Sequence, residues 1–290
     1  MPTYSALTTL PDAANAQALG EAMEAMTPEP TGVGVFEMED GSELWEVGGY
    51  FTKPPSEAEL ALLAAAFGAR PFAVSEVPDI DWVAKVRREL TPVEAGRFFV
   101  YGSHDADKLP EGRIGLLIEA AMAFGTGHHG TTQGCLSAID ALADAGVQPR
   151  RIADIGCGTA VLAMGAARVW ACDPVLASDI DAVAVDVAQA NVTANGLDGR
   201  VHCLEAVGFD HPQIAEAAPF DLILANILKG PLIDLAPAMA AHAAPGGYVI
   251  LSGLLERQAE EVLAAYAAQG LTLHARLDIE GWSTLTLRRA

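Results

Sequence analysis

The stretch Arg151-Ile-Ala-Asp-Ile-Gly-Cys-Gly-Thr-Ala-Val-Leu-Ala163 decides the fold class of this chain. It predicts a short apolar strand that breaks at two glycines and continues as an apolar helix. Gly156 and Gly158 allow the backbone to turn sharply and to approach a ligand closely. A second apolar strand, Val175-Leu-Ala-Ser-Asp179, stops at an acid 25 residues after Asp154. Because such an acid can accept hydrogen bonds from two ribose hydroxyls, the two segments predict a nucleotide-type cleft.

Two classes of cofactor fit this outline. Dinucleotide folds carry G-x-G-x-x-G, in which glycines and a helix N-terminus receive a pyrophosphate. Here Asp154 precedes the glycines, and Val161 stands where the third glycine of that motif belongs. The anionic Asp154 disfavours a pyrophosphate and suits cationic groups, such as the amino acid end and sulfonium of S-adenosylmethionine. We therefore expect an S-adenosylmethionine site whose contacts include Asp154, Gly156, Gly158 and Asp179. A nicotinamide dehydrogenase remains the alternative.

The chain of 290 residues is strongly acidic, with a formal net charge of −21. A surface of this charge repels phosphate backbones, so we expect no direct binding of nucleic acid. The charge is uneven, since residues 1–52 contain nine acids and no Lys or Arg. This segment is either a solubilising surface or a docking module for a basic protein, whose encounter complementary charge would steer.

Residue usage elsewhere predicts a cytoplasmic enzyme without a metal. The four cysteines show no C-x-x-C spacing, which is typical of free thiols in a reducing compartment. No basic segment followed by an apolar run opens the chain, so no signal peptide is expected. The uncharged stretch 235–255 is interrupted by prolines and a Gly-Gly pair, which disfavours a membrane span. The adjacent His128 and His129 lack the spacing of metal ligands.

Residues 1–80 predict a small α+β domain. Strands are expected at 4–10, 33–38, 44–51 and 72–77, and helices at 12–26 and from Pro54 to about 68. A turn at 39–42 joins the second and third strands as a hairpin. The order β-α-β-β-α-β is that of a ferredoxin-like domain. Residues 81–112, with Trp82, a basic patch at Lys85, Arg87 and Arg88, and a strand at 97–101, predict a connector.

Residues 113–290 predict an α/β domain with a mostly parallel sheet. Strands are expected at 114–120, 151–155, 175–180, 201–207, 220–225 and 248–252, and helices at 131–144, 160–169, 182–195, 230–243 and 256–269. Alternation at this spacing requires right-handed crossovers between parallel strands. The final strands, 271–279 and 282–288, are joined through Glu280-Gly281 and predict an antiparallel finish.

Two further segments are candidates for the site. The apolar run from Phe220 leads into Asn226, at the same expected sheet edge as Asp154 and Asp179. The Asn226 side chain either caps the next helix or takes part in the site, and the shared edge favours the second reading. Upstream, Ala123-Phe-Gly-Thr-Gly-His-His-Gly-Thr-Thr132 combines glycines, hydroxyl residues and a helix start, which predicts a loop that can fold over a ligand.

At these segments the sequence resembles the bacterial ribosomal protein L11 methyltransferases of the PrmA type. The resemblance is carried by residues 123–132, 154–159, 178–181, 225–232 and 251–254. The loop and the Asn-Ile-Leu segment are more diagnostic than the glycine turn, which most methyltransferases share. The resemblance implies a seven-stranded Rossmann-like methyltransferase domain preceded by a small ferredoxin-like domain that recognises the substrate.

The resemblance also implies the chemistry. Members of this family transfer methyl groups from S-adenosylmethionine to lysine ε-amines and the N-terminal amine of a basic large-subunit ribosomal protein at the stalk base. Carried onto this chain, the family's cofactor contacts fall on Thr132, Gly156, Asp179 and Asn226. Two departures stand out: His128 and Gly130 replace a Thr and a Pro of the family loop, and Ala160 replaces a third glycine.

The expected reaction is an in-line displacement by an amine. A lysine amine has a pKa of about 10.4 and must lose a proton first, which an apolar pocket favours by disfavouring the ammonium form. We expect the Asn226 oxygen to accept a hydrogen bond from the amine, and Phe124 and Thr126 to close the pocket. No residue stands out as a general base, and the protein is expected to be a monomer. The alternatives are a methyltransferase acting on RNA or a small amine, and a cofactor-sensing module without activity.

Overall fold

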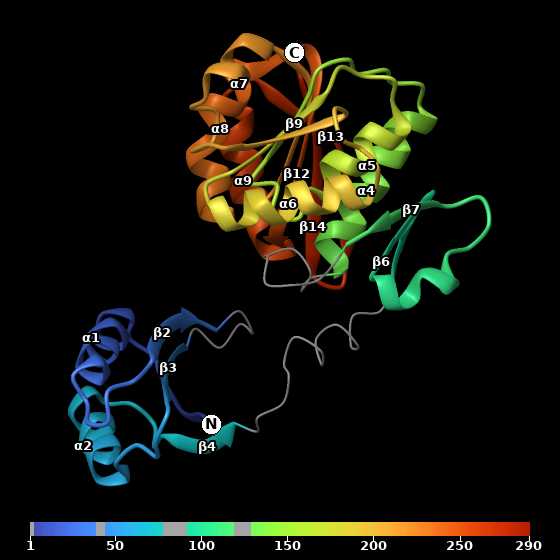
Figure 1. Ribbon diagram of the computed structural model, residues 1–290. Coiled ribbons are helices and arrows are strands. Elements are labelled where there is room, and N and C mark those ends of the chain that lie inside the picture. Colours follow the sequence, from blue (N-terminus) through green and yellow to red (C-terminus); the bar gives the residue numbers. More distant parts are fainter. Residues whose placement is uncertain (1–2, 39–43, 78–91, 119–128) are drawn as a thin grey trace. The chain divides into compact units, whose positions relative to one another are not determined.

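The computed structural model describes residues 3–38, 44–77, 92–118 and 129–290 (Figure 1). Its contacts divide the chain into two compact units, Met1–Trp82 and Val83–Ala290. Three features expected from the sequence lie outside the described residues: the hairpin turn at 39–42, the basic patch of the connector, and most of the loop that begins at Ala123.

The N-terminal unit has the expected order of strands and helices. Its elements are β1 (Thr3–Leu10), α1 (Ala13–Glu24), β2 (Gly32–Glu37), β3 (Trp45–Phe51), α2 (Glu57–Phe67) and β4 (Ala73–Val77). The strands form one sheet in the order β2-β3-β1-β4, and β1 is antiparallel to both of its neighbours. The Asp12 carboxylate caps α1 and the Ser56 hydroxyl caps α2, each accepting a backbone N–H of the first turn.

The two helices of this unit cover one face of its sheet (Figure 1). The core beneath them contains Leu10, Leu19, Met23, Val47, Phe51 and Leu60. Side chains alternate between the faces of a strand, so Tyr50 and Phe36 point to the opposite face. Phe36 keeps 65% of its surface exposed and Tyr50 47%. This open face therefore presents two aromatic side chains to solvent.

A seven-stranded sheet forms the centre of the C-terminal unit. Its order is β10-β9-β8-β11-β12-β14-β13, and its strands are β8 (Ile152–Ile155), β9 (Val175–Asp179), β10 (Val201–Glu205), β11 (Phe220–Asn226), β12 (Ala243–Leu255), β13 (Leu271–Ile279) and β14 (Trp282–Arg289). The run from β10 to β12 is parallel, whereas β14 is antiparallel to β12 and to β13. The expected parallel sheet with an antiparallel finish is confirmed.

Helices lie on both sides of this sheet. They are α4 (His129–Asp144), α5 (Val161–Val169), α6 (Ala182–Ala194), α7 (Pro212–Ala217), α8 (Lys229–His242) and α9 (Ala259–Ala267). The short α7 has no counterpart among the helices expected from the sequence, and β12 is longer than expected. Within the described part of the chain, no helix combines the length and apolarity that crossing a bilayer requires.

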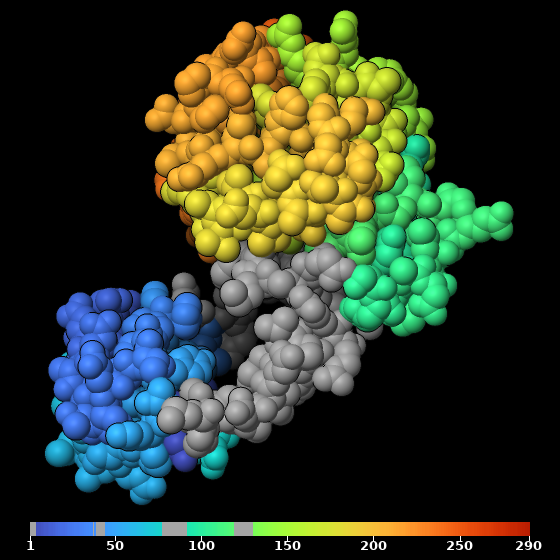
Figure 2. All heavy atoms as spheres, in the orientation of Figure 1, coloured from blue at the N-terminus to red at the C-terminus, as the bar shows by residue number. Residues whose placement is uncertain are grey.

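One expected strand of the large sheet lies elsewhere. β7 (Ile114–Leu117) pairs in parallel with β6 (Phe98–Tyr101), which is antiparallel to β5 (Val93–Ala95), in a separate three-stranded sheet. Phe98 is buried in a core shared with α4 and α5, and Arg97 forms ion pairs with two acids of α4. The segment from β5 to β7, green in Figure 2, therefore packs on α4 and α5 within the C-terminal unit. Strand length and hydrophobicity predict a strand here but do not specify its pairing partner.

Two apolar cores cover the faces of the large sheet. Along β11, Leu222 and Leu224 belong to the core that includes residues of α4 and α5, and Ile223 and Ala225 to the core that includes residues of α8 and α9. A strand buried on both faces has a nearly continuous run of apolar residues, as β11 has from Leu222 to Ala225. Parallel pairing of β9, β8 and β11 brings their carboxyl ends to one edge of the sheet, where ligands bind in open α/β folds.

Candidate functional site

The turn after β8 is built from glycines that other residues cannot replace without strain. Gly156 has φ +72° and Gly158 has φ +52°, a region that favours glycine. A Cβ at Gly156 would clash with the Ile227 side chain. The Ser178 carbonyl accepts the N–H groups of Gly156 and Cys157 at 2.8 and 2.9 Å. The turn is therefore fixed to the end of β9.

Asp179 holds the same turn with its side chain. Its Oδ2 accepts the backbone N–H of Gly158 at 2.9 Å, and its Oδ1 accepts the N–H of Asp181 at 3.1 Å. An ionised carboxylate has about four acceptor positions, so both oxygens keep capacity for a ligand hydroxyl. The structure thus brings the two sequence segments that predicted a cleft into direct contact.

Asp154 carries the most perturbed carboxyl group of this edge. Its side chain is 1% exposed, and its Oδ2 accepts the N–H of Ala163 at 3.0 Å. Among the described residues, its Oδ1 has no hydrogen-bond partner. Burial raises the pKa of Asp154 to about 7, and the charge of nearby Asp179 adds to the shift. A buried carboxylate oxygen without a partner is costly, and a cationic ligand group placed beside it would remove that cost.

Asn226 lies at the end of β11, beside the first turn of α4. Its Nδ2 donates to Thr131 Oγ1 at 3.4 Å, so its Oδ1 points away from that hydroxyl. The capping residue of α8 is Leu228, which makes no side-chain cap hydrogen bond. Asn226 therefore does not cap this helix; its side chain contacts α4, and the residue stands at the sheet edge that the ends of β8 and β9 share.

The remaining predicted residues divide into described and undescribed ones. Thr132 is described and lies buried on the first turn of α4. Phe124 and Thr126 lie outside the described residues. Ala160, at the third-glycine position, has φ +60° and is fully buried. The left-handed backbone there explains why glycine suits this position, and Ala, with the smallest side chain, still occupies it.

The sequence marks the segments around Ile227 and Gly253 as family motifs but does not show that they support Asn226. Ile227 contacts the glycine turn with its side chain, and its N–H donates to the Ser252 carbonyl at 3.2 Å. Gly253 has φ +84°, and a Cβ there would clash with the Ile227 backbone. The Ser-Gly pair was visible in the sequence, but only pairing across the sheet shows that it lies beside Asn226.

Asp154, Asp179 and Asn226 stand at the carboxyl ends of three neighbouring parallel strands. Within the described ranges, no group of three or more His, Cys, Asp or Glu side chains has the geometry to hold a metal ion. Asp179 holds the glycine turn and Asp154 the helix that follows it, at the edge of a parallel sheet where open α/β folds bind their ligands.

Comparison with known proteins identifies the family. A family model described as ribosomal protein L11 methyltransferase (PrmA) matches residues 13–290. A protein of Rhodopseudomonas palustris (strain BisB5), named ribosomal protein L11 methyltransferase, is 48% identical over 261 residues, covering 89% of this chain and 87% of the relative. A relative of the same name from Brucella melitensis biotype 2 is 46% identical over 256 residues, covering 88% of this chain and 89% of its own length.

A solved structure agrees with the sequence relatives. The ribosomal protein L11 methylase of Lactobacillus delbrueckii subsp. bulgaricus superposes with a TM-score of 0.60 at 26% identity, covering 69% of this chain and 98% of that one. With matches of this extent in sequence and in fold, the chain belongs to the ribosomal protein L11 methyltransferase family.

Proposed function

We propose that this protein transfers methyl groups from S-adenosylmethionine to lysine ε-amines and the N-terminal amine of ribosomal protein L11. The observation that carries the proposal is the convergence of Asp154, Asp179 and Asn226 at one sheet edge in a chain of this family. The substrate is proposed from the relatives described above, which are named ribosomal protein L11 methyltransferase. The site geometry supports the roles proposed below for the individual residues.

The residues present fit S-adenosylmethionine. The Gly156–Gly158 turn gives the backbone the close approach that a nucleoside requires, and Asp179 offers carboxylate oxygens to ribose hydroxyls. The free Oδ1 of Asp154 suits the cationic end of the molecule. Thr132 adds a hydroxyl from α4. When bound, S-adenosylmethionine would supply an electrophilic methyl group on a sulfonium.

Asn226 is proposed to orient the amine that receives the methyl group. Because Nδ2 is directed to Thr131, Oδ1 can accept a hydrogen bond from a neutral amine and hold its lone pair in line. The apolar surroundings of the β11 end favour the neutral over the charged form of that amine. Phe124 and Thr126 are proposed to close the pocket over it, and solvent to take the proton.

The N-terminal unit is proposed to recognise the substrate protein. Residues 1–52 carry nine acids and no base, so this region attracts a basic partner electrostatically. The open face of its sheet offers apolar contact through Phe36 and Tyr50. Aromatic groups surrounded by charge are typical of protein–protein interfaces. The proposed partner is ribosomal protein L11, bound by a monomer without direct contact to nucleic acid.

A labelling experiment tests this function. The protein would be incubated with S-adenosylmethionine labelled in the methyl group and, separately, with L11 and with ribosomal RNA. Label is expected in L11, on amines that mass spectrometry can identify. Label in RNA alone would instead support the alternative substrate, and binding of the donor without any labelled product would support a sensing module.

A cellular experiment tests the substrate independently. The mass of L11 from cells that lack this chain is expected to decrease by whole methyl groups and to recover when the gene is restored. An unchanged mass of L11 would refute the substrate assignment.

A further inference from the structure

Strand β12 carries a bulge next to the end of β11. Leu251 pairs with Leu285 and Leu254 pairs with Ser283, so three steps along β12 correspond to two along β14. The extra residue falls at the Ser252–Gly253 pair, where Gly253 has φ +84°. Bulges re-aim the strand and are common beside active sites.

The bulge contacts the residue that follows Asn226. Ser252 is the register partner of Asn226, and its carbonyl accepts the Ile227 N–H at 3.2 Å. Gly253 approaches the Ile227 backbone so closely that no Cβ fits. On the other side, the Ile227 side chain fills the space beside Gly156. Ile227 is thus held between the bulge and the glycine turn, and this fixes the position from which the Asn226 side chain projects.

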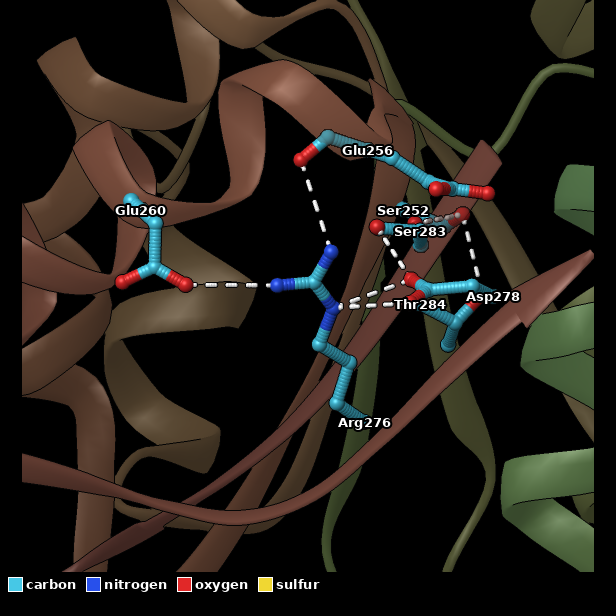
Figure 3. A network of polar contacts seen from close by, with 7 residues as sticks. All are labelled: Ser252, Glu256, Glu260, Arg276, Asp278, Ser283 and Thr284. Atoms are coloured by element: carbon cyan, nitrogen blue, oxygen red, sulfur yellow. Dashed lines mark hydrogen bonds and ion pairs between the residues drawn. The ribbon is translucent and has the colours of Figure 1, made fainter. Parts of the chain in front are cut away.

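Two buried hydroxyls hold the bulge in place (Figure 3). Ser252 Oγ donates to the Ser283 carbonyl at 2.9 Å, and Thr284 Oγ1 donates to Ser252 Oγ at 3.1 Å. Ser252 is fully buried and Thr284 nearly so. Loss of one such hydroxyl leaves its buried partner without a hydrogen bond, which is costly and drives a local rearrangement.

The same hydroxyls also contact α4. A Cβ at Gly134 of α4 would clash with the Thr284 hydroxyl, and the next residue, Cys135, is buried in the same helix. The first turn of α4 carries Thr131, which accepts a hydrogen bond from Asn226 Nδ2. Ser252 and Thr284 therefore contact the two elements that position the Asn226 amide, the β12 bulge and α4.

The outer part of the network consists of four exposed residues, Glu256, Glu260, Arg276 and Asp278, and the buried Ser283 joins it to the inner part. Ser283 Oγ donates to the Asp278 carboxylate, which also accepts Arg276 Nε at 3.0 Å (Figure 3). Arg276 additionally reaches Glu260 at 3.2 Å and the Glu256 carbonyl at 3.4 Å. Solvent screens such ion pairs, so they contribute little to stability. A variant of Arg276 therefore serves as a control for variants of the buried Ser252 and Thr284.

We infer that Thr284 and Ser252 are positioning residues for methyl transfer: their hydroxyls fix the β12 bulge and α4, and through these the Asn226 amide. The inference rests on the proposed role of Asn226. It assigns a task in the reaction to β14, a strand that pairs with β12 and β13 and not with β8 or β9.

Isosteric variants of Thr284 test the inference. Thr284→Val keeps the shape and removes the hydroxyl, and Thr284→Ser keeps the hydroxyl. Thr286→Val is the matched control, since Thr286 is a buried threonine two residues further along the same strand. With L11 as substrate, kcat is expected to fall about 10- to 100-fold in Thr284→Val, because small misplacements of a reacting group have effects of this size. The KM for S-adenosylmethionine is expected to stay within about twofold of the wild-type value.

The control variants are expected to keep kcat within about twofold of the wild-type value. They are Thr284→Ser, Thr286→Val and Arg276→Gln, the last because the ion pairs of Arg276 are exposed.

A double-mutant cycle separates positioning from general loss of structure. If Thr284 acts through Asn226, Thr284→Val has no further effect on kcat in the Asn226→Ala background. Additive losses, an equal loss in Thr286→Val, or wild-type kcat in a folded Thr284→Val protein would each overturn the inference. Failure of the proposed function appears differently, as a wild-type protein that leaves L11 unmethylated while circular dichroism shows it folded.

Discussion

Asp179 Oδ2 accepts the backbone N–H of Gly158 at 2.9 Å, so the acid that ends β9 also holds the glycine turn that follows β8. One side chain therefore shapes the cleft and is proposed to bind the cofactor within it. Replacing Asp179 disturbs both tasks, whereas replacing a nearby solvated acid disturbs neither.

Asp179→Asn is expected to weaken S-adenosylmethionine binding about 10- to 100-fold, because a hydrogen bond to a charged group contributes about 1.5–3 kcal/mol. Calorimetric titration of the purified protein measures this. Asp186→Asn, which removes an exposed acid of α6, is the control and should bind as the wild type does. Unchanged affinity in Asp179→Asn, or tight binding of NAD by the wild type, would contradict the assignment of the site.

The raised pKa of Asp154 predicts a pH dependence of cofactor binding. Below pH 7 the buried carboxyl group is mostly protonated, since its pKa is about 7. A cationic ligand favours the ionised form, so binding should tighten as the pH rises from about 6 to 8 and should release protons to the buffer. Calorimetry in two buffers of different ionisation enthalpy measures the proton release. Asp154→Asn should bind more weakly and without this dependence.

The same group predicts a pH dependence of stability. The native carboxyl group binds a proton more tightly than the unfolded one, whose pKa is 3.8. Between pH 4 and 7 the native state holds more protons, so this group makes the free energy of unfolding of the ligand-free protein fall as the pH rises through that window. Denaturant titrations should show a shallower fall in Asp154→Asn than in the wild type. A slope that is equal in both proteins would show that Asp154 ionises normally.

Asn226→Ala is expected to lower kcat for L11 about 100-fold through loss of amine positioning. S-adenosylmethionine affinity should fall by less, because the Asp154 and Asp179 contacts remain. Thr131→Val is a companion variant: it removes the hydroxyl that accepts from Nδ2, and an intermediate loss is expected. Thr131→Ser, which keeps the hydroxyl, serves as its control. Near-wild-type transfer by Asn226→Ala would remove this residue from the mechanism.

Gly156→Ala tests the close approach of Ile227 to the turn. Two costs are expected, left-handed backbone strain of about 1–2 kcal/mol and the clash of the new Cβ with the Ile227 side chain. Gly146→Ala separates them, since Gly146 has φ +77° and open space around its Cβ position. The melting temperature should fall in both variants and cofactor affinity only in Gly156→Ala. Equal affinity in the two variants would show that the turn tolerates a side chain.

Phe36→Ser combined with Tyr50→Ser tests the open face of the N-terminal unit. The KM for L11 is expected to rise about tenfold or more, because interface aromatics contribute about 2 kcal/mol each when they are central. Leu62→Ser is the matched control, since Leu62 is 71% exposed but belongs to α2, on the covered side of the sheet. A KM that responds to Leu62→Ser and not to the aromatic pair would place the substrate on the helices.

Much of this architecture follows from local sequence pattern. Apolar runs ending in Asp154, Asp179 and Asn226 predict strands that share an edge, because parallel strands end on the same side. The β7 pairing was not predictable in this way, since a four-residue apolar strand fits any sheet that offers a partner. The support for Asn226 from Gly253 was equally hidden, because it depends on a register shift between distant strands.

The antiparallel direction of β14 has a consequence for folding. Its first residues, not its last, lie beside the carboxyl ends of the parallel strands, and the first turn of α4 packs on the hairpin that precedes it, where a Cβ at Gly130 would lie 2.9 Å from the Ile279 carbonyl. The edge proposed to bind the methyl donor is therefore completed by β14, a strand far in sequence from β8 and β9. The complete site forms only once β14 has paired with β12, so a partly folded chain without this long-range pairing has the glycine turn but not the support of Asn226.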